Sequence, residues 1–88
     1  MNNLKKIKIH FIGIGGIGMS GIAELMLDLG YQIQGSDLNN NSNIQRLKKR
    51  GVKFFNNHKK ENINDVSAVV FSSAIKKNNP EILQSEKL

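Results

Sequence analysis

The chain has 88 residues, of which 39% are hydrophobic and 23% charged, and this composition is typical of one small soluble globular domain. It has no cysteine, which excludes disulfides, thiolate metal sites and a cysteine nucleophile. The formal net charge of +6 favours phosphorylated ligands or nucleic acid, but the lysines are scattered with few aromatic residues between them, so we expect a solvated basic surface and no nucleic-acid partner. No apolar run approaches the length of a membrane span and no signal-peptide pattern is present, so we expect a cytoplasmic protein without a membrane partner.

The N-terminal part of the chain predicts a strand followed by a phosphate-binding turn. Residues 1–5 are expected to be a frayed start, and a strand is predicted from about Lys6 to Ile12. The segment His10–Gly21 reads His-Phe-Ile-Gly-Ile-Gly-Gly-Ile-Gly-Met-Ser-Gly. Three of its glycines, Gly13, Gly15 and Gly18, have the spacing of the pattern G-x-G-x-x-G. In a dinucleotide-binding turn the first glycine permits a tight turn, the second lets backbone approach a pyrophosphate, and the third lets the helix lie close to the sheet.

A helix is predicted after the turn, from about Gly16 to Leu29, with Gly30 as the residue that ends it. Its apolar residues recur at helical spacing, with acidic residues on the opposite face: Ile22, Leu25, Met26 and Leu29 against Glu24 and Asp28. The unpaired N–H groups of its first turn and the positive end of its dipole would form an anion site. Ser20, in that turn, either donates to a phosphate or is a small residue that permits close packing.

A second strand is predicted over Tyr31–Ser36, and Asp37 at its end has two interpretations. A carboxylate about 20 residues beyond the last glycine of the turn is suited to bind ribose hydroxyls. Alternatively, Asp37 simply starts the polar loop Asn39–Asn43. Ser42 and Gln45 have the spacing of a capping box for a helix over about Asn43–Arg50.

The rest of the chain continues the alternation of strands and helices. The second helix should bury Ile44 and Leu47 and end at Gly51. We then expect a short strand, a polar loop, a buried strand and a last helix capped by Asn79 and Pro80, with the strands at Val52–Phe55 and Ala68–Phe71. This order predicts an α/β fold: a Rossmann-like parallel sheet of about four strands with flanking helices, forming one mononucleotide-binding half.

The histidines and the segment after the last strand can be placed relative to that sheet. His10, within a strand, is expected to be buried with a satisfied hydrogen bond. His58 is either a solvent-exposed bystander or a ligand-side residue, because its loop follows the carboxyl end of a strand. Ser72, Ser73, Ala74 and Ile75 follow the last strand at the same side.

The residue types give no means of breaking a covalent bond. No nucleophile, base and orienting group can be assembled, and the P-loop pattern is missing. The chain is therefore predicted to bind a nucleotide diphosphate and to contain no catalytic residue and no metal site. Spacing alone leaves open whether the ligand is a dinucleotide or a nucleotide sugar.

The order of motifs resembles the N-terminal domain of the Mur ligases of peptidoglycan synthesis, specifically the UDP-N-acetylmuramate:L-alanine ligases. The resemblance extends from about Lys6 to Pro80 through the glycine turn, Gly-Ser-Asp, Gln-Arg-Leu and Ser-Ser-Ala-Ile-Lys-Lys-Asn-Asn-Pro-Glu. It implies that residues 1–88 form the domain that holds the UDP part of UDP-N-acetylmuramate. It also implies that ATP and magnesium bind a central domain and that a C-terminal domain positions L-alanine, neither of which lies in these 88 residues, so this chain alone should be inactive.

The resemblance also implies roles for individual residues. The diphosphate would lie among Gly13, Gly15, Gly16, Ile17, Gly18, Met19 and Ser20. Ser36 and Asp37 would lie near the ribose, and His58 and the turn Ser72, Ser73, Ala74 and Ile75 would line the uridine end. The alternatives are an NAD-binding half-domain of a dehydrogenase or redox sensor, with Asp37 on the adenosine ribose, and an interaction domain whose glycine turn is only structural.

Overall fold

The computed structural model describes residues 6–88, and the predicted frayed start lies outside the described residues. The elements follow in the order β1 (Lys8–Ile12), α1 (Ile17–Asp28), β2 (Gln32–Ser36), α2 (Ser42–Lys49), β3 (Lys53–Phe55), the 3-10 helix η2 (Lys60–Ile63), β4 (Ala68–Phe71) and α3 (Pro80–Lys87). The predicted elements are all present, with ends that differ by one or two residues at most positions. The 3-10 helix lies within the segment predicted as a polar loop.

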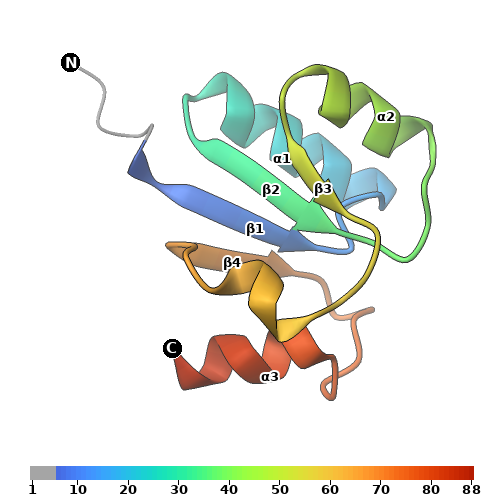
Figure 1. The fold of residues 1–88 in the computed structure, drawn as a ribbon. Helices are drawn as coiled ribbons and strands as arrows, with labels where there is room; N and C mark the ends of the chain where they lie inside the picture. The colour runs from blue at the N-terminus through green and yellow to red at the C-terminus, as the bar shows by residue number, and fades with distance from the viewer. Residues whose placement is uncertain (1–5) are drawn as a thin grey trace.

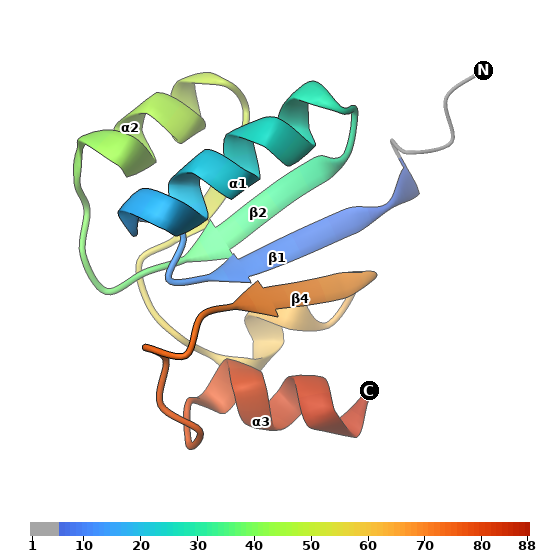
Figure 2. The ribbon, with the colours of Figure 1, turned by 180° about the vertical axis from the view of Figure 1, so that it is seen from behind.

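The four strands form one parallel sheet in the order β3-β2-β1-β4. Helices α1 and α2 cover one face, and α3 and η2 cover the other (Figure 1). Figure 2 shows the same layers from behind, with the arrows of β1, β2 and β4 pointing to the same edge of the sheet. This confirms the predicted Rossmann-like half and brings the loops after the strands together at one edge.

The main hydrophobic core lies between the sheet and the helices α1 and α2. Successive residues of a strand face opposite sides of the sheet, and β1 places Ile9 and Phe11 on this side. The buried cluster consists of Ile9, Phe11, Ile14, Ala23, Ile33, Ile44, Leu47 and Val52. Ile44 and Leu47 are each 1% exposed, so the predicted buried face of α2 is confirmed.

The strand β4 is an edge strand rather than the buried strand that its apolar sequence predicts. It pairs only with β1, and its first and last residues, Ala68 and Phe71, are exposed. A continuous apolar run predicts coverage on both faces. In the described residues, no helix on the α1 side covers this edge, so the pattern overstates its burial.

The helix α1 buries a different face from the one that its apolar spacing predicts. Ile22, Leu25 and Leu29 are 48–58% exposed. Ser20 and Ala23 face the sheet, and Met26 and Leu27 are partly buried beside them. Glu24 and Asp28 instead face α2, where they pair with Arg46 and Arg50. The helix therefore has apolar residues on two faces, which periodicity alone does not distinguish.

The start of α2 differs from the predicted capping box. The N-cap is Asn41, one residue before Ser42, and its side-chain oxygen accepts from the N–H of Ile44 at 3.0 Å. Asn41 also donates to the carbonyl of Gly15, which holds the loop against the glycine turn. The last helix is capped as predicted, since Asn79 accepts from the N–H of Glu81 and Pro80 is the first helical residue.

Close packing at a glycine occurs in β2 rather than at the third glycine of the turn. A Cβ atom on Gly35 would lie 2.5–2.6 Å from side-chain atoms of Ile14, whereas Gly18 has nothing within 4 Å of such an atom. The expectation that Gly18 lets the helix approach the sheet is therefore wrong, and Gly35 has that role for the loop that carries Ile14. No helix within residues 6–88 is long and apolar enough to cross a membrane.

Candidate functional site

A cavity of about 340 Å³ lies at the carboxyl edge of the sheet, within the size range of small-molecule sites. Loops after β1, β2, β3 and β4 all contribute to it. The lining residues are Gly13, Gly15, Gly16, Met19, Asp37, Leu38, Asn39, Asn41, His58, Ser72, Ala74 and Ile75. This is the position at which open α/β sheets bind their ligands, next to the crossover that reverses the strand order.

The glycine turn between β1 and α1 is held by backbone hydrogen bonds to the neighbouring strand. Gly13 has a φ of 79°, a left-handed conformation that a side chain would strain. The N–H groups of Gly13 and Ile14 both donate to the carbonyl of Ser36, at 2.8 and 3.0 Å. The turn is thereby fixed to the end of β2, so its geometry does not depend on a ligand.

The carboxylate of Asp37 binds the glycine turn itself. Its Oδ2 accepts from the N–H of Gly15 at 2.9 Å, and its Oδ1 accepts from the N–H of Asn39 at 2.9 Å. The carbonyl of Gly15 accepts from the side chains of Asn41 and Asn43. Both backbone groups of Gly15 are thus occupied within the chain, and the residue cannot offer its N–H to a phosphate unless Asp37 moves.

The N–H groups of the first turn of α1 remain available for an anion. The first helical hydrogen bond runs from Ser20 to the carbonyl of Gly16 at 2.8 Å. Within residues 6–88, the N–H groups of Ile17, Gly18 and Met19 have no hydrogen-bond partner, as expected for the start of a helix. The first turn has no acidic residue, so the positive end of the 12-residue helix is uncompensated there.

The predicted site residues divide into those that line this cavity and those that do not. The lining set contains eight of them: Gly13, Gly15, Gly16, Met19, Asp37, His58, Ser72 and Ala74. Five others lie outside it: Ile17, Gly18, Ser20, Ser36 and Ser73. Ser20 is 1% exposed and donates to the carbonyl of Ile17 at 3.1 Å, so its hydroxyl points back into the helix. Ser36 is fully buried.

Sequence reasoning assigned no ligand role to three cavity residues, Leu38, Asn39 and Asn41. The available signal was their position directly after Asp37, since every residue of that loop leaves the carboxyl end of β2. Leu38 is 69% exposed and leaves an apolar surface at the mouth of the cavity.

His58 lies between this cavity and a second one of about 440 Å³. The second cavity has a largely apolar lining that includes Leu38, Ala74, Ile75 and Pro80. The His58 side chain is 13% exposed, and its Nδ1 lies 2.9 Å from the hydroxyl oxygen of Ser36. One edge of the ring is therefore held in the protein, while the residue itself borders both cavities.

A buried polar network lies beneath His58, on the α3 side of the sheet. The carboxylate of Glu81, in α3, is its centre and is completely buried. One oxygen of this carboxylate lies 2.7 Å from Nε2 of His10 and accepts from Ser36 at 2.6 Å. The other accepts from the side chain of Asn62 at 2.7 Å and the backbone of Lys59 at 3.1 Å. The expectation of a buried, hydrogen-bonded His10 is confirmed.

These contacts shift the ionisation of Glu81. Burial by itself raises the pKa of the Glu81 carboxyl, but the hydrogen bonds from His10, Ser36 and Asn62 lower it by more in sum. The pKa consequently lies below its usual value, and the buried group is a carboxylate at neutral pH. The sequence signal for Glu81 is its place beside Asn79 and Pro80 at the start of a helix, which suggests a helix cap but not a buried centre.

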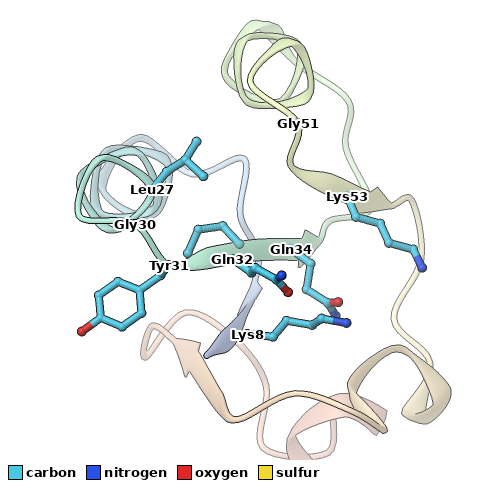
Figure 3. Close-up of a pocket in the computed structure, with 9 residues that line it drawn as sticks. Lys8, Leu27, Gly30, Tyr31, Gln32, Gln34, Gly51 and Lys53 are labelled. Carbon is cyan, nitrogen blue, oxygen red and sulfur yellow. The ribbon is translucent and has the colours of Figure 1, made fainter. Parts of the chain in front are cut away.

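A larger cavity, of about 530 Å³, lies at the opposite edge of the sheet (Figure 3). It borders the amino ends of β1, β2 and β3, and its lining includes Lys8, Tyr31, Gln34 and Lys53. Lys8 is already paired with Asp65 at 2.9 Å. Within residues 8–88 no helix begins at this edge, so there the cavity lacks the backbone N–H groups that distinguish the carboxyl edge. Among residues 6–88, no group of three or more histidine, cysteine, aspartate or glutamate side chains could hold a metal ion.

Comparison with known proteins connects this site to one family. The family model described as "Mur ligase family, catalytic domain" matches residues 8–88. UDP-N-acetylmuramate--L-alanine ligases from Brucella anthropi and Brucella ovis are 59% and 57% identical to the chain over 81 residues, which are 91% of this chain and 17% of each relative. The crystal structure of a UDP-N-acetylmuramate-alanine ligase from Thermotoga maritima is 36% identical and superposes with a TM-score of 0.87, covering 92% of this chain and 19% of that one.

The chain thus spans about a sixth of the length of the curated relatives it matches. The comparisons give no support to a dehydrogenase or redox sensor. The family match covers all elements from β1 to α3, including the glycine turn and the network around Glu81. This chain belongs to the Mur ligase family.

Proposed function

We propose that this chain binds the UDP part of UDP-N-acetylmuramate and serves as the N-terminal domain of a UDP-N-acetylmuramate–L-alanine ligase in peptidoglycan synthesis. The observation that carries the proposal is the cavity at the carboxyl edge, next to the open first turn of α1. The similar ligases are named for UDP-N-acetylmuramate, and we take the substrate proposed for this chain from those names.

The diphosphate would lie at the first turn of α1. There the N–H groups of Ile17, Gly18 and Met19 can donate to phosphate oxygens, and the helix dipole favours negative charge. The carboxylate of Asp37 binds Gly15 and Asn39, so it shapes the turn, and its exposed side borders the place for a ribose. The uridine would extend from there towards His58 and the turn formed by Ser72, Ser73 and Ala74.

The ligation itself would require parts of the protein beyond these 88 residues. We assign ATP, magnesium and L-alanine to a central and a C-terminal domain, and we expect this chain alone to bind substrate without turnover. The fully assembled ligase would work in the cytoplasm, where its nucleotide substrates are found.

The proposal is tested by calorimetric titration of the chain with UDP-N-acetylmuramate, UDP, uridine and NAD. We expect saturable binding of both UDP compounds, weaker binding of uridine because it has no diphosphate, and no saturable binding of NAD. Binding should weaken as the salt concentration rises, because part of the attraction is between phosphate charge and the helix terminus. Binding of NAD in preference to UDP would contradict the proposal.

A further inference from the structure

The buried network determines where His10 carries its proton. Nε2 of Gln34 lies 2.7 Å from the backbone oxygen of Asn62 and 2.7 Å from Nδ1 of His10. A carbonyl oxygen only accepts, so it is the amide nitrogen of Gln34 that faces it, and that nitrogen donates its second hydrogen to His10. Nδ1 of His10 is therefore an acceptor, and its Nε2–H donates to Glu81 at 2.7 Å.

The same reasoning determines where His58 carries its proton. The single hydroxyl proton of Ser36 is donated to the Glu81 carboxylate at 2.6 Å. The contact of 2.9 Å between the Ser36 oxygen and Nδ1 of His58 therefore needs a proton on Nδ1. The series of groups Glu81, Ser36 and His58 thus favours the Nδ1–H form of His58, in which Nε2 has a free lone pair.

The other ring nitrogen of His58 is open to a ligand. Every buried side-chain nitrogen and oxygen among residues 6–88 has a hydrogen-bond partner. Nε2 of His58 has none in that range, so it must be accessible to solvent. Because His58 borders both cavities of the carboxyl edge, this acceptor is available to a ligand bound there.

We propose that Glu81 and Ser36 are positioning residues that hold His58 as a hydrogen-bond acceptor for the N3–H of uracil. The inference rests on the proposed function. Phosphate oxygens have no hydrogen to donate at neutral pH, so the partner of Nε2 lies on the nucleoside. The neighbouring cavity, with its apolar residues Leu38, Ala74, Ile75 and Pro80, suits the flat face of a base better than a hydrated ribose.

This arrangement selects uracil over cytosine. Uracil has an N–H at position 3, whereas cytosine has an acceptor nitrogen there, which would face the lone pair of Nε2. With cytosine, two acceptor nitrogens would face each other without a hydrogen between them, and in a partly buried site this lowers the affinity for that base. The buried carboxylate thereby acts on base choice through Ser36, without touching the ligand.

The first test reads the protonated nitrogen directly. The chain has two histidines, so ¹⁵N-labelled histidine gives two sets of ring signals in long-range ¹⁵N–¹H correlation spectra. At neutral pH we expect the proton on Nε2 in His10 and on Nδ1 in His58. A proton on Nε2 of His58 in the unliganded chain would overturn the inference without any variant having to fold.

The second test measures base choice by titration with UDP and CDP. The unmodified chain should prefer UDP, and S36A should lower this preference by about threefold to tenfold, the usual worth of one hydrogen bond. E81Q should lower it in the same direction, and E86Q, the same change at an exposed position of α3, should leave it unchanged. S36A should also move the His58 proton towards Nε2, which a purely structural loss would not do selectively.

The outcomes separate this inference from the proposed function. Equal affinity for UDP and CDP overturns the proposal that His58 selects uracil, but it is compatible with the proposed binding of UDP. Absence of binding by either nucleotide overturns the proposed function together with the base reading. A preference for UDP that S36A and E81Q both retain, in folded variants, shows that the positioning residues are not needed and overturns their role.

Discussion

At the scale of single residues, the glycines of the turn and of helix α1 differ in how closely other atoms surround them. Gly15 is enclosed, because an added Cβ would lie 2.8–3.1 Å from Ile44, Asp37 and Asn41. Gly18 and Gly21 have nothing within 4 Å of an added Cβ. A substitution at Gly15 therefore changes the fold and the phosphate site together, while a substitution at Gly18 changes only the exposed first turn of α1.

We predict that Gly18→Val weakens UDP binding about tenfold or more without loss of stability. The Cα–Cβ bond in a helix points towards the N-terminus, so the new side chain would cover the first-turn N–H groups that the phosphates need. Gly21→Val, one turn later in the helix, is the matched control and should bind normally. The measurements are calorimetric affinity and urea unfolding, and an unchanged affinity in folded Gly18→Val would remove the first turn from the site.

A second prediction concerns the effect of a substitution at Gly35 on the free energy of unfolding. Gly35→Ala would force its Cβ to within 2.5–2.9 Å of side-chain atoms of Ile14, which is 1% exposed. We expect the free energy of unfolding to fall by about 1–3 kcal/mol, the usual cost of overpacking. Gly21→Ala, in an exposed helical position, should raise it by up to about 1 kcal/mol. Urea denaturation checks both, and a Gly35→Ala variant as stable as the parent would contradict the packing described for β2.

At the scale of elements, α3 is attached to the sheet through a charged group. Glu81 lies in the first turn of α3 and is bound by residues of β1, β2 and η2. Ile82, beside it, is 4% exposed and supplies apolar contact. Helix α3 is therefore held partly by an ionised carboxylate, whose contribution depends on pH.

We predict that the free energy of unfolding decreases as the pH falls, and that protonation of Glu81 causes much of this decrease. The pKa of Glu81 in the folded chain lies below its ordinary value of 4.5, so its contribution is complete above that pH and is lost as the pH falls through the folded pKa. Glu81→Gln should cost about 2 kcal/mol at neutral pH and should flatten the loss of stability below pH 4.5. Urea midpoints from neutral to acid pH measure this.

Glu86→Gln is the control for that experiment, since it removes an exposed carboxylate from the same helix. It should keep the acid dependence of the parent chain. Glu24 and Asp65 also have lowered pKa values, through their hydrogen bonds to Arg46 and Lys8, so some acid dependence should remain in Glu81→Gln. A steep acid dependence that is identical in Glu81→Gln and the parent would show that Glu81 is not the controlling group.

The elements were predictable from sequence to different degrees. The strands β1 and β2, the helix α1 and the caps at Gly30 and Asn79 follow from local signals that act within a few residues. The buried face of α1 does not, because both of its faces carry apolar residues and only the packed sheet selects between them. The network around Glu81 joins residues up to 71 positions apart, and no local pattern brings those together.

At the scale of the whole molecule, cavities lie at two opposite edges of one sheet. The carboxyl edge has a cavity of about 340 Å³ next to the start of α1, whereas the cavity of about 530 Å³ at the amino edge has no helix start beside it within residues 8–88. We propose that the ligand binds at the carboxyl edge, because the free N–H groups of the first turn of α1 matter more for a phosphorylated ligand than cavity volume does. The glycine pattern predicts the carboxyl edge, because every parallel strand delivers its following loop to that side.

The most direct measurement is a ¹⁵N–¹H correlation titration of the chain with UDP-N-acetylmuramate. We predict saturable shifts of the backbone N–H signals of Ile17, Gly18 and Met19, with those of Gln32 and Lys53 at the amino edge unchanged. Saturable shifts confined to Gln32, Lys53 and their neighbours would place the ligand in the larger cavity and contradict the account.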